Sequence, residues 1–260
     1  VRWFQKAGGK TLVDLTCPGL GRDARGLKTI AEKSGVQIIA STGFYRECSY
    51  PDYVIAETAE QLAQRMIREC REGIEDTGVK PGILAEIATE YAVGRMSAQE
   101  EKVFTAVAYA QREIGLPVST HCWAGQLAFP QIDILTRNGV PPHKIIIGHL
   151  AVDNTVRDHV FKIADTGVYL GIDCIGFEYE RVVAMKDRDK AQFVKELIGG
   201  GFLNRITISQ DLIRKLMLKH YHGSGYDYLL LKFIPLLRQA GVSDADIHTL
   251  LVENPKQIFA

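Results

Sequence analysis

The stretch Ile145-Ile146-Ile147-Gly148-His149 is a short, strongly apolar run that is typical of a β-strand and ends in a side chain able to bind metal. Three more runs share this pattern of apolar residues followed by a potential ligand. They are Gly82-Ile83-Leu84-Ala85-Glu86, Val118-Ser119-Thr120-His121 and Ile206-Thr207-Ile208-Ser209-Gln210-Asp211. Because the carboxyl ends of the strands in a parallel barrel all face one mouth, the four runs predict side chains that converge on one point.

In the rest of the sequence, strand-like segments alternate with segments whose apolar residues have helical spacing. This alternation is typical of repeated βα units around a parallel sheet. We expect three further strands over residues 11–16, 37–42 and 168–173, which makes seven in all. We expect helices over about 24–34, 58–77 and 98–114, and a last helix that ends near Asn254. Ser97 and Glu100 have the spacing of a capping box at the start of the third of these helices.

Parallel barrels close at eight strands, so seven predicted strands leave two interpretations. The chain opens on Val1, and residues 2–9 are typical of a helix end that runs into a glycine turn. We therefore expect an α/β protein with the (β/α)8 TIM barrel fold, as a single domain over residues 1–260, whose first strand lies upstream of this sequence. The alternative is an open, doubly wound sheet of seven strands. No G-x-G-x-x-G motif follows the first strand, and polar strand ends fit a barrel mouth better.

The bulk composition argues against several function classes. The formal net charge is zero, which is not typical of a surface dedicated to nucleic acid or anionic membranes. No apolar run approaches the roughly 18–20 residues that a membrane helix needs. The five cysteines form no C-x-x-C pair, which indicates free thiols in a reducing compartment. Since no secretory signal opens the sequence, we expect a cytoplasmic protein that acts on a small molecule.

Each of the four strand-end residues has a structural and a functional interpretation. His121 or His149 alone could be a structural residue, but both follow a small residue on adjacent predicted strands, which favours ligands at the mouth. Glu86 is costly to bury unpaired, so it either forms a salt bridge at the rim or bridges two cations. Asp211 either caps the next helix or binds metal and accepts the proton of a metal-bound water. Carboxylate and imidazole together favour Zn, with Mn, Co or Fe as alternatives, over Mg or Ca.

Longer motifs around these residues resemble those of the phosphotriesterase family of the amidohydrolase superfamily, in the same order and with the same spacing. The likeness covers essentially the whole chain and is closest to the phosphotriesterase homology branch. The motifs include Asp14-Leu15-Thr16, Ala85-Glu86-Ile87, Ser119-Thr120-His121, Ile147-Gly148-His149, Ser209-Gln210-Asp211, Gln99-Glu100-Glu101-Lys102-Val103-Phe104 and Gly225-Tyr226-Asp227-Tyr228-Leu229-Leu230.

The resemblance implies a barrel with two divalent metal ions, most simply Zn, and a metal-bridging hydroxide that attacks an ester-type bond in a carboxylic ester, lactone or phosphoester. By position, Glu86 resembles the bridging carboxylate and His121 and His149 the ligands of the second metal. Asp211 would bind the first metal and act as catalytic base. The alternatives are an amidohydrolase that cleaves a C–N bond at the same site and a degenerate barrel that binds metal without chemistry. The resemblance also implies a homodimer.

Two departures from the family bear on this expectation. The first metal of the family needs a His-x-His at the end of the first strand, and none precedes Asp14, so we expect that pair upstream. Cys174 stands where the lactonases carry Arg and the organophosphate hydrolases carry His. Tyr45 does match a mouth tyrosine of the lactonases. We expect Tyr45, Cys174 and His222, the last in the loop after the final strand, to contact the substrate.

Overall fold

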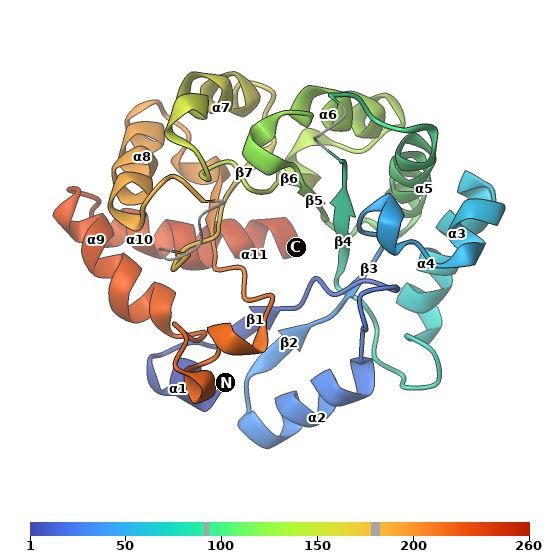
Figure 1. The fold of residues 1–260 in the computed structure, drawn as a ribbon, viewed down its shortest axis with the longest axis horizontal. Coiled ribbons are helices and arrows are strands. Elements are labelled where there is room, and N and C mark those ends of the chain that lie inside the picture. The colour runs from blue at the N-terminus through green and yellow to red at the C-terminus, as the bar shows by residue number, and fades with distance from the viewer. Residues whose placement is uncertain (91–93, 178–182) are drawn as a thin grey trace.

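Parallel strands run around the centre of the molecule and helices lie outside them (Figure 1). The computed structural model describes residues 1–90, 94–177 and 183–260. Every strand pair in it is parallel. The strands are β1 (Thr11–Val13), β2 (Gln37–Ile39), β3 (Ser41–Thr42), β4 (Ile83–Ala88), β5 (Val118–His121), β6 (Ile145–Ile147), β7 (Tyr169–Ile172) and β8 (Ile206–Ile208).

The strands pair in sequence order. β1 pairs with β2, and β3 to β8 form a second sheet in which each strand lies next to its neighbour in the chain. A doubly wound sheet reverses its strand order at a switch point, and the described strands show no such reversal. Sequential parallel strands with helices outside the ring are the arrangement of a (β/α)8 TIM barrel, and this confirms the predicted fold class.

The predicted strand over 37–42 is two strands in the structure. Residues of β2 pair with β1, whereas Ser41 and Thr42 of β3 pair with Ile83 and Leu84 of β4. Ala40 lies between the two strands, and its carbonyl accepts a hydrogen bond of 2.9 Å from the backbone N–H of Gly82. The chain therefore changes its pairing partner at Ala40, and this single residue joins the two sheets.

The helices fill the connections between the strands. They are α1 (Arg2–Lys6), α2 (Ala24–Ser34), α3 (Asp52–Ala56), α4 (Ala59–Glu72), α5 (Ala98–Ile114), α6 (Ala128–Arg137), α7 (Arg157–Ala164), α8 (Asp187–Gly199), α9 (Ile234–Gln239), α10 (Asp244–His248) and α11 (Asn254–Phe259). Among them, no described helix has the length and apolar character needed to cross a lipid bilayer.

Two predicted helix ends are wrong. α2 and α5 have the predicted bounds, and α5 carries the predicted capping box. α4 ends at Glu72, not at residue 77, because Gly73 adopts a φ of 116° that an α-helix does not allow. The last helix does not end near Asn254, since α11 begins there and runs to Phe259. Pro255 lies in its first turn, and the wide helical turn Thr249–Glu253 runs directly into it.

The helix α11 covers the end of the barrel at which the strands begin. The side chain of Asn254 is fully buried and donates hydrogen bonds to the carbonyls of Leu203 and Ile206, at the start of β8. Lys144, just before β6, donates to the carbonyl of Ile258 at 3.1 Å. Figure 1 shows α11 crossing the centre of the ring. One end of the barrel is thereby closed, and the carboxyl ends of the strands form the other, open end.

Candidate active site

Three of the predicted metal ligands meet near the carboxyl ends of β4, β5 and β6. The prediction that the strand ends at Glu86 is wrong, because β4 continues to Ala88 and Glu86 lies within it. Nδ1 of His121 lies 3.3 Å and Nε2 of His149 lies 3.2 Å from the same atom, Oε1 of Glu86. The ligand atoms of these three residues all lie within 4.8 Å of one another. The two imidazole rings are both buried, with centroids 4.3 Å apart. We call Glu86, His121 and His149 the central cluster.

The orientation of His149 is fixed by Asp173, which directly follows β7. Nδ1 of His149 donates to Oδ1 of Asp173 at 2.8 Å, and the backbone N–H of His149 donates to Oδ2 at 2.8 Å. A carboxylate behind one ring nitrogen leaves the other nitrogen free to bind a metal ion. Asp173 is a site residue that was not predicted, although it ends the predicted strand over 168–173 and so carried the same sequence signal as His121 and His149.

The pKa shifts of the central cluster follow from burial and mutual charge. Burial raises the pKa of Glu86, but the hydrogen bonds and charges of His121 and His149 outweigh burial and hold it below its ordinary value. Burial lowers the pKa of His149, but the Asp173 carboxylate outweighs burial and raises it well above its ordinary value. Burial also lowers the pKa of His121. This shift favours the neutral imidazole, which is the form that binds metal.

Asp211 lies at the same mouth but outside the central cluster. Its Oδ2 accepts a hydrogen bond of 3.8 Å from the thiol of Cys174, and that sulfur lies 3.6 Å from Nδ1 of His149. Burial and the negative charge of Glu86 raise the pKa of Asp211 to about 7. The next helical turn begins after Arg214, which makes no side-chain cap, so the interpretation of Asp211 as a helix cap is not supported.

The three residues expected to contact the substrate occupy different positions. The hydroxyl of Tyr45 lies 3.3 Å from Nδ1 of His121, and the two rings meet edge to face. The thiol of Cys174 is fully buried between His149 and Asp211. His222 is exposed in the loop after β8. Tyr45 therefore borders the central cluster, while contact of Cys174 and His222 with a substrate stays a prediction.

A buried glutamine holds the end of β5. Gln131 of α6 is fully buried, and its Oε1 accepts a hydrogen bond of 2.7 Å from the hydroxyl of Thr120. Its Nε2 donates to the hydroxyl of Thr89 at 2.8 Å and to the carbonyl of His121 at 3.1 Å. The side chain thus connects the ends of β4 and β5 and fixes the backbone of a predicted ligand.

Replacing Gln131 with Leu is expected to lower the free energy of unfolding by about 3 kcal/mol, because it leaves buried polar partners unsatisfied at about 1–3 kcal/mol each. Urea denaturation followed by circular dichroism measures the change. Gln192→Leu on the exposed face of α8 is the control, and we expect it to shift stability by less than about 0.5 kcal/mol. Equal stabilities for the two variants would contradict the role of Gln131.

Two further side chains, Cys17 and Lys190, make hydrogen bonds to the backbone next to the residues of the site. The sulfur of Cys17 donates to the carbonyl of Ala85 and accepts from the backbone N–H of Glu86, both at 2.8 Å. Lys190 is fully buried and donates to the carbonyls of Asp173 and Cys174. These two roles were not predicted, since nothing in the local sequence shows that either side chain reaches the end of a strand.

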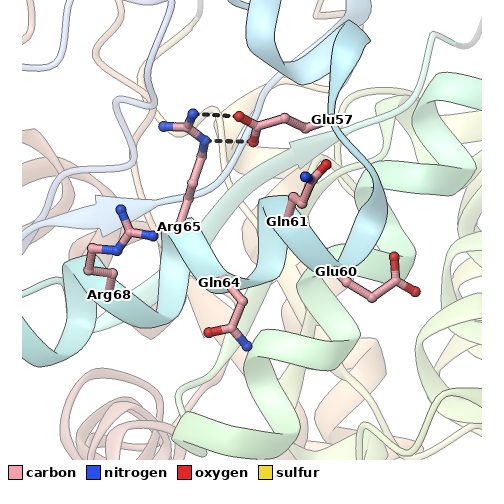
Figure 2. Close-up of a pocket in the computed structure, with 6 residues that line it drawn as sticks. All are labelled: Glu57, Glu60, Gln61, Gln64, Arg65 and Arg68. Carbon is pink, nitrogen blue, oxygen red and sulfur yellow. Dashed lines mark hydrogen bonds and ion pairs between the residues drawn. The ribbon is translucent and has the colours of Figure 1, made fainter.

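A surface hollow on α4 is separate from this site. It is lined by polar side chains, and two hydrogen bonds join Arg65 to Glu57 there (Figure 2). The helix lies outside the ring of strands (Figure 1). The remaining lining residues are Glu60, Gln61, Gln64 and Arg68.

The protein is a parallel α/β barrel in which carboxylate and imidazole groups cluster at the carboxyl ends of the strands. Enzymes with this fold have their active sites at that end, so the fold and the cluster place the protein in the class of barrel enzymes. Comparison with known sequences narrows this class. The profile of the Phosphotriesterase family matches residues 1–259, and the chain belongs to this family of hydrolases.

Two curated relatives align with nearly the whole chain. The phosphotriesterase homology protein of Escherichia coli is 35% identical over 252 residues, which cover 97% of this chain and 84% of that protein. The N-acetyltaurine hydrolase of Xenopus tropicalis is 34% identical over 263 residues, which cover 98% of this chain and 74% of that protein.

Solved structures agree with the fold. The crystal structure of the Escherichia coli phosphotriesterase homology protein, complexed with phosphate in its active site, superposes with a TM-score of 0.93 at 33% identity. It covers 100% of this chain and 87% of that one. A lactonase from Listeria monocytogenes superposes with a TM-score of 0.88 at 27% identity, covering 99% of this chain and 83% of that one.

Proposed function

We propose that the chain is a metal-dependent hydrolase that cleaves the acyl–nitrogen bond of small N-acyl compounds, with Glu86, His121 and His149 as metal ligands. The observation that carries this proposal is the placement of two imidazole nitrogens at 3.3 and 3.2 Å from one buried carboxylate oxygen. One carboxylate and two imidazoles are a donor set that suits Zn and neighbouring divalent metals. When bound, such an ion lowers the pKa of a coordinated water and polarises the acyl oxygen of the substrate.

The protein's own groups would hold the ligands and move the proton. Asp173 supports the ring of His149, so that Nε2 faces Glu86. Asp211, whose pKa burial raises to about 7, is suited to accept a proton near neutral pH and return it to the leaving group. Tyr45 places a hydroxyl beside His121, where it can donate to the substrate. We further propose that Asp211 and Glu86 share a second divalent ion.

The choice of an acyl–nitrogen bond is supported by the relatives. Seven of the curated relatives, from Dictyostelium discoideum to Homo sapiens, are named N-acetyltaurine hydrolase, at 31–34% identity. That name describes cleavage of an amide, in which the leaving amine must gain a proton. Cleavage of a carboxylic ester or lactone is the second candidate, which the similarity to the Listeria monocytogenes lactonase favours.

The experiment that tests the proposal combines metal analysis with a substrate panel. Protein purified without added metal is expected to contain divalent metal, and chelation is expected to remove both the metal and the activity, which added Zn restores. N-acyl amino compounds, lactones, aryl esters and phosphotriesters are then compared by kcat/KM. Preferred hydrolysis of N-acyl compounds supports the proposal. Faster lactone or ester turnover would favour the second candidate, and metal-free protein with no turnover would refute both.

A further inference from the structure

A large aromatic side chain lies beside the two imidazole rings of the central cluster. Trp123 follows β5 by two residues, and its ring centroid lies 5.8 Å from that of His149 and 6.5 Å from that of His121. The indole plane makes an angle of only 29° with the plane of the His121 ring. The side chain is half-buried, so part of it remains accessible to solvent. An accessible apolar surface therefore borders two of the predicted metal ligands.

The position of Trp123 is fixed by the tight turn that follows it. The backbone N–H of Ala124 donates to the carbonyl of His149 at 3.0 Å, which joins the loop after β5 to the loop after β6. Gly125 has a φ of 68°, and a side chain at this position would come within 2.9 Å of Ile163. A surface that is held in place before a ligand arrives loses little conformational entropy on binding.

A second apolar cluster, separate from the main core, lies against Trp123. It combines side chains from the loops that follow β5, β6 and β7, and its buried members are Ala124, Val152, Cys174, Phe177 and Val183. Cys174 connects this cluster to the site, since its sulfur lies 3.6 Å from Nδ1 of His149. The apolar surface at Trp123 is therefore continuous with the wall of the central cluster, and the side chains behind it carry no charge.

The two aromatic neighbours of His121 offer different chemistry to a substrate. Tyr45 places a hydroxyl group 3.3 Å from Nδ1 of His121, whereas Trp123 presents an indole ring stacked on the imidazole. The proposed proton transfer puts the leaving nitrogen beside Asp211, which follows β8. In the sheet, β5 and β8 are separated by β6 and β7. The acyl side of the scissile bond would then lie on the side of Trp123.

We propose that Trp123 is a specificity-determining residue that binds the acyl group of the substrate, so that neutral, unbranched acyl groups longer than acetyl are preferred. This inference rests on the proposed function. An acetyl group has a single methyl to place against the indole ring, whereas each further methylene that leaves water strengthens binding about fourfold. A charged group at the end of the acyl chain would lose its hydration against an apolar wall without gaining a partner.

The first test compares three substrates that differ only in the acyl chain. N-acetylglycine, N-propanoylglycine and N-butanoylglycine are assayed with the wild-type chain, and kcat/KM is determined for each. We expect kcat/KM to rise about fourfold with each added methylene, and so about 15-fold from the acetyl to the butanoyl compound. Equal or falling values along the series would overturn the inference.

Substitutions at the two tryptophans assign the preference to one residue. Trp123→Ala is expected to reduce the butanoyl-to-acetyl ratio of kcat/KM to less than about threefold, whereas Trp123→Phe keeps an aromatic ring and most of the ratio. Trp3→Phe is the matched control, because Trp3 is the other tryptophan of the chain and is 51% exposed on α1. It is expected to leave the ratio unchanged. If Trp123→Ala lowered kcat/KM equally for all three substrates, Trp123 would only support the imidazole rings, and the inference would fail.

A binding measurement keeps this inference distinguishable from the proposed function. In Trp3→Phe protein, Trp123 is the single remaining tryptophan, so its fluorescence reports binding beside the central cluster. Acetate, butanoate and hexanoate, the acyl products of such a reaction, are titrated in turn. A change in Trp123 emission and an affinity that rises at least about tenfold from acetate to hexanoate would support the acyl site even if no hydrolysis is found in any assay. Equal affinities, or emission that does not change, would overturn the acyl site even if the wild-type chain hydrolyses N-acyl compounds.

Discussion

Replacing Glu86 with Gln is expected to remove metal from the chain and to lower kcat/KM by at least about a thousandfold, or about 4 kcal/mol of transition-state stabilisation. Gln has nearly the same shape but lacks the negative charge that both imidazoles of the central cluster face. A neutral amide oxygen is a weak ligand for a divalent ion compared with a carboxylate. Elemental analysis gives the metal content per chain, and steady-state kinetics give the loss of activity.

The control for this variant is Glu101→Gln, which makes the same chemical change on the exposed face of α5. It is expected to keep both metal content and turnover. Full metal content in Glu86→Gln would show that the metal ion, if present, is held elsewhere, and the assignment of the central cluster as a metal centre would be wrong.

Replacing Asp211 with Asn is expected to lower kcat by about 10²- to 10⁴-fold, which is the usual contribution of a general base. Asn keeps the size of the side chain and its contact with Cys174 but cannot accept the proton. Because Asp211 lies outside the central cluster, the metal held by Glu86, His121 and His149 is expected to remain, whereas the second ion that Asp211 is proposed to share with Glu86 is expected to be lost. Turnover at a saturating substrate concentration measures the effect, and thermal unfolding shows whether the fold is intact.

The result for Asp211→Asn separates two roles. A large loss of kcat together with about half of the metal is the expected result, since Asp211 is proposed both to accept the proton and to bind the second ion. A large loss of kcat with all metal retained would support proton transfer alone and would contradict the second ion at Asp211. Unchanged kcat would exclude both roles and would leave Asp211 as a buried acid that merely contacts Cys174.

Much of the barrel could be predicted because its strands are short, apolar and separated by helices of regular period. The change of partner at Ala40 could not be predicted, because residues 37–42 contain no Gly or Pro that would mark a break. The break depends on the carbonyl of Ala40, which meets the backbone N–H of Gly82. The end of α4 was also missed. Gly73 ends that helix by its backbone conformation, whereas the polar residues that follow resemble a helix surface.

The predicted ligands of the site could be found from the sequence, but the residues that support them could not. Glu86, His121, His149 and Asp211 stand out because each is a polar residue that follows a short apolar, strand-like run. The residues that support these four do not follow apolar strand-like runs, so the sequence pattern does not mark them. Gln131 acts from a helix on a strand next to it in space, and its contacts to Thr89 and His121 exist only once the barrel has formed. Local sequence patterns report burial and period, not which distant groups become neighbours.

The three residues of the central cluster come from β4, β5 and β6, which are adjacent and hydrogen-bonded to one another. Tyr45, which borders the central cluster and is expected to contact the substrate, follows β3, outside that block. Parts of the chain that select a substrate can thus diverge in sequence and length without disturbing the block that holds the ligands. A barrel built this way is well placed to acquire new substrates during evolution while its reaction chemistry stays the same.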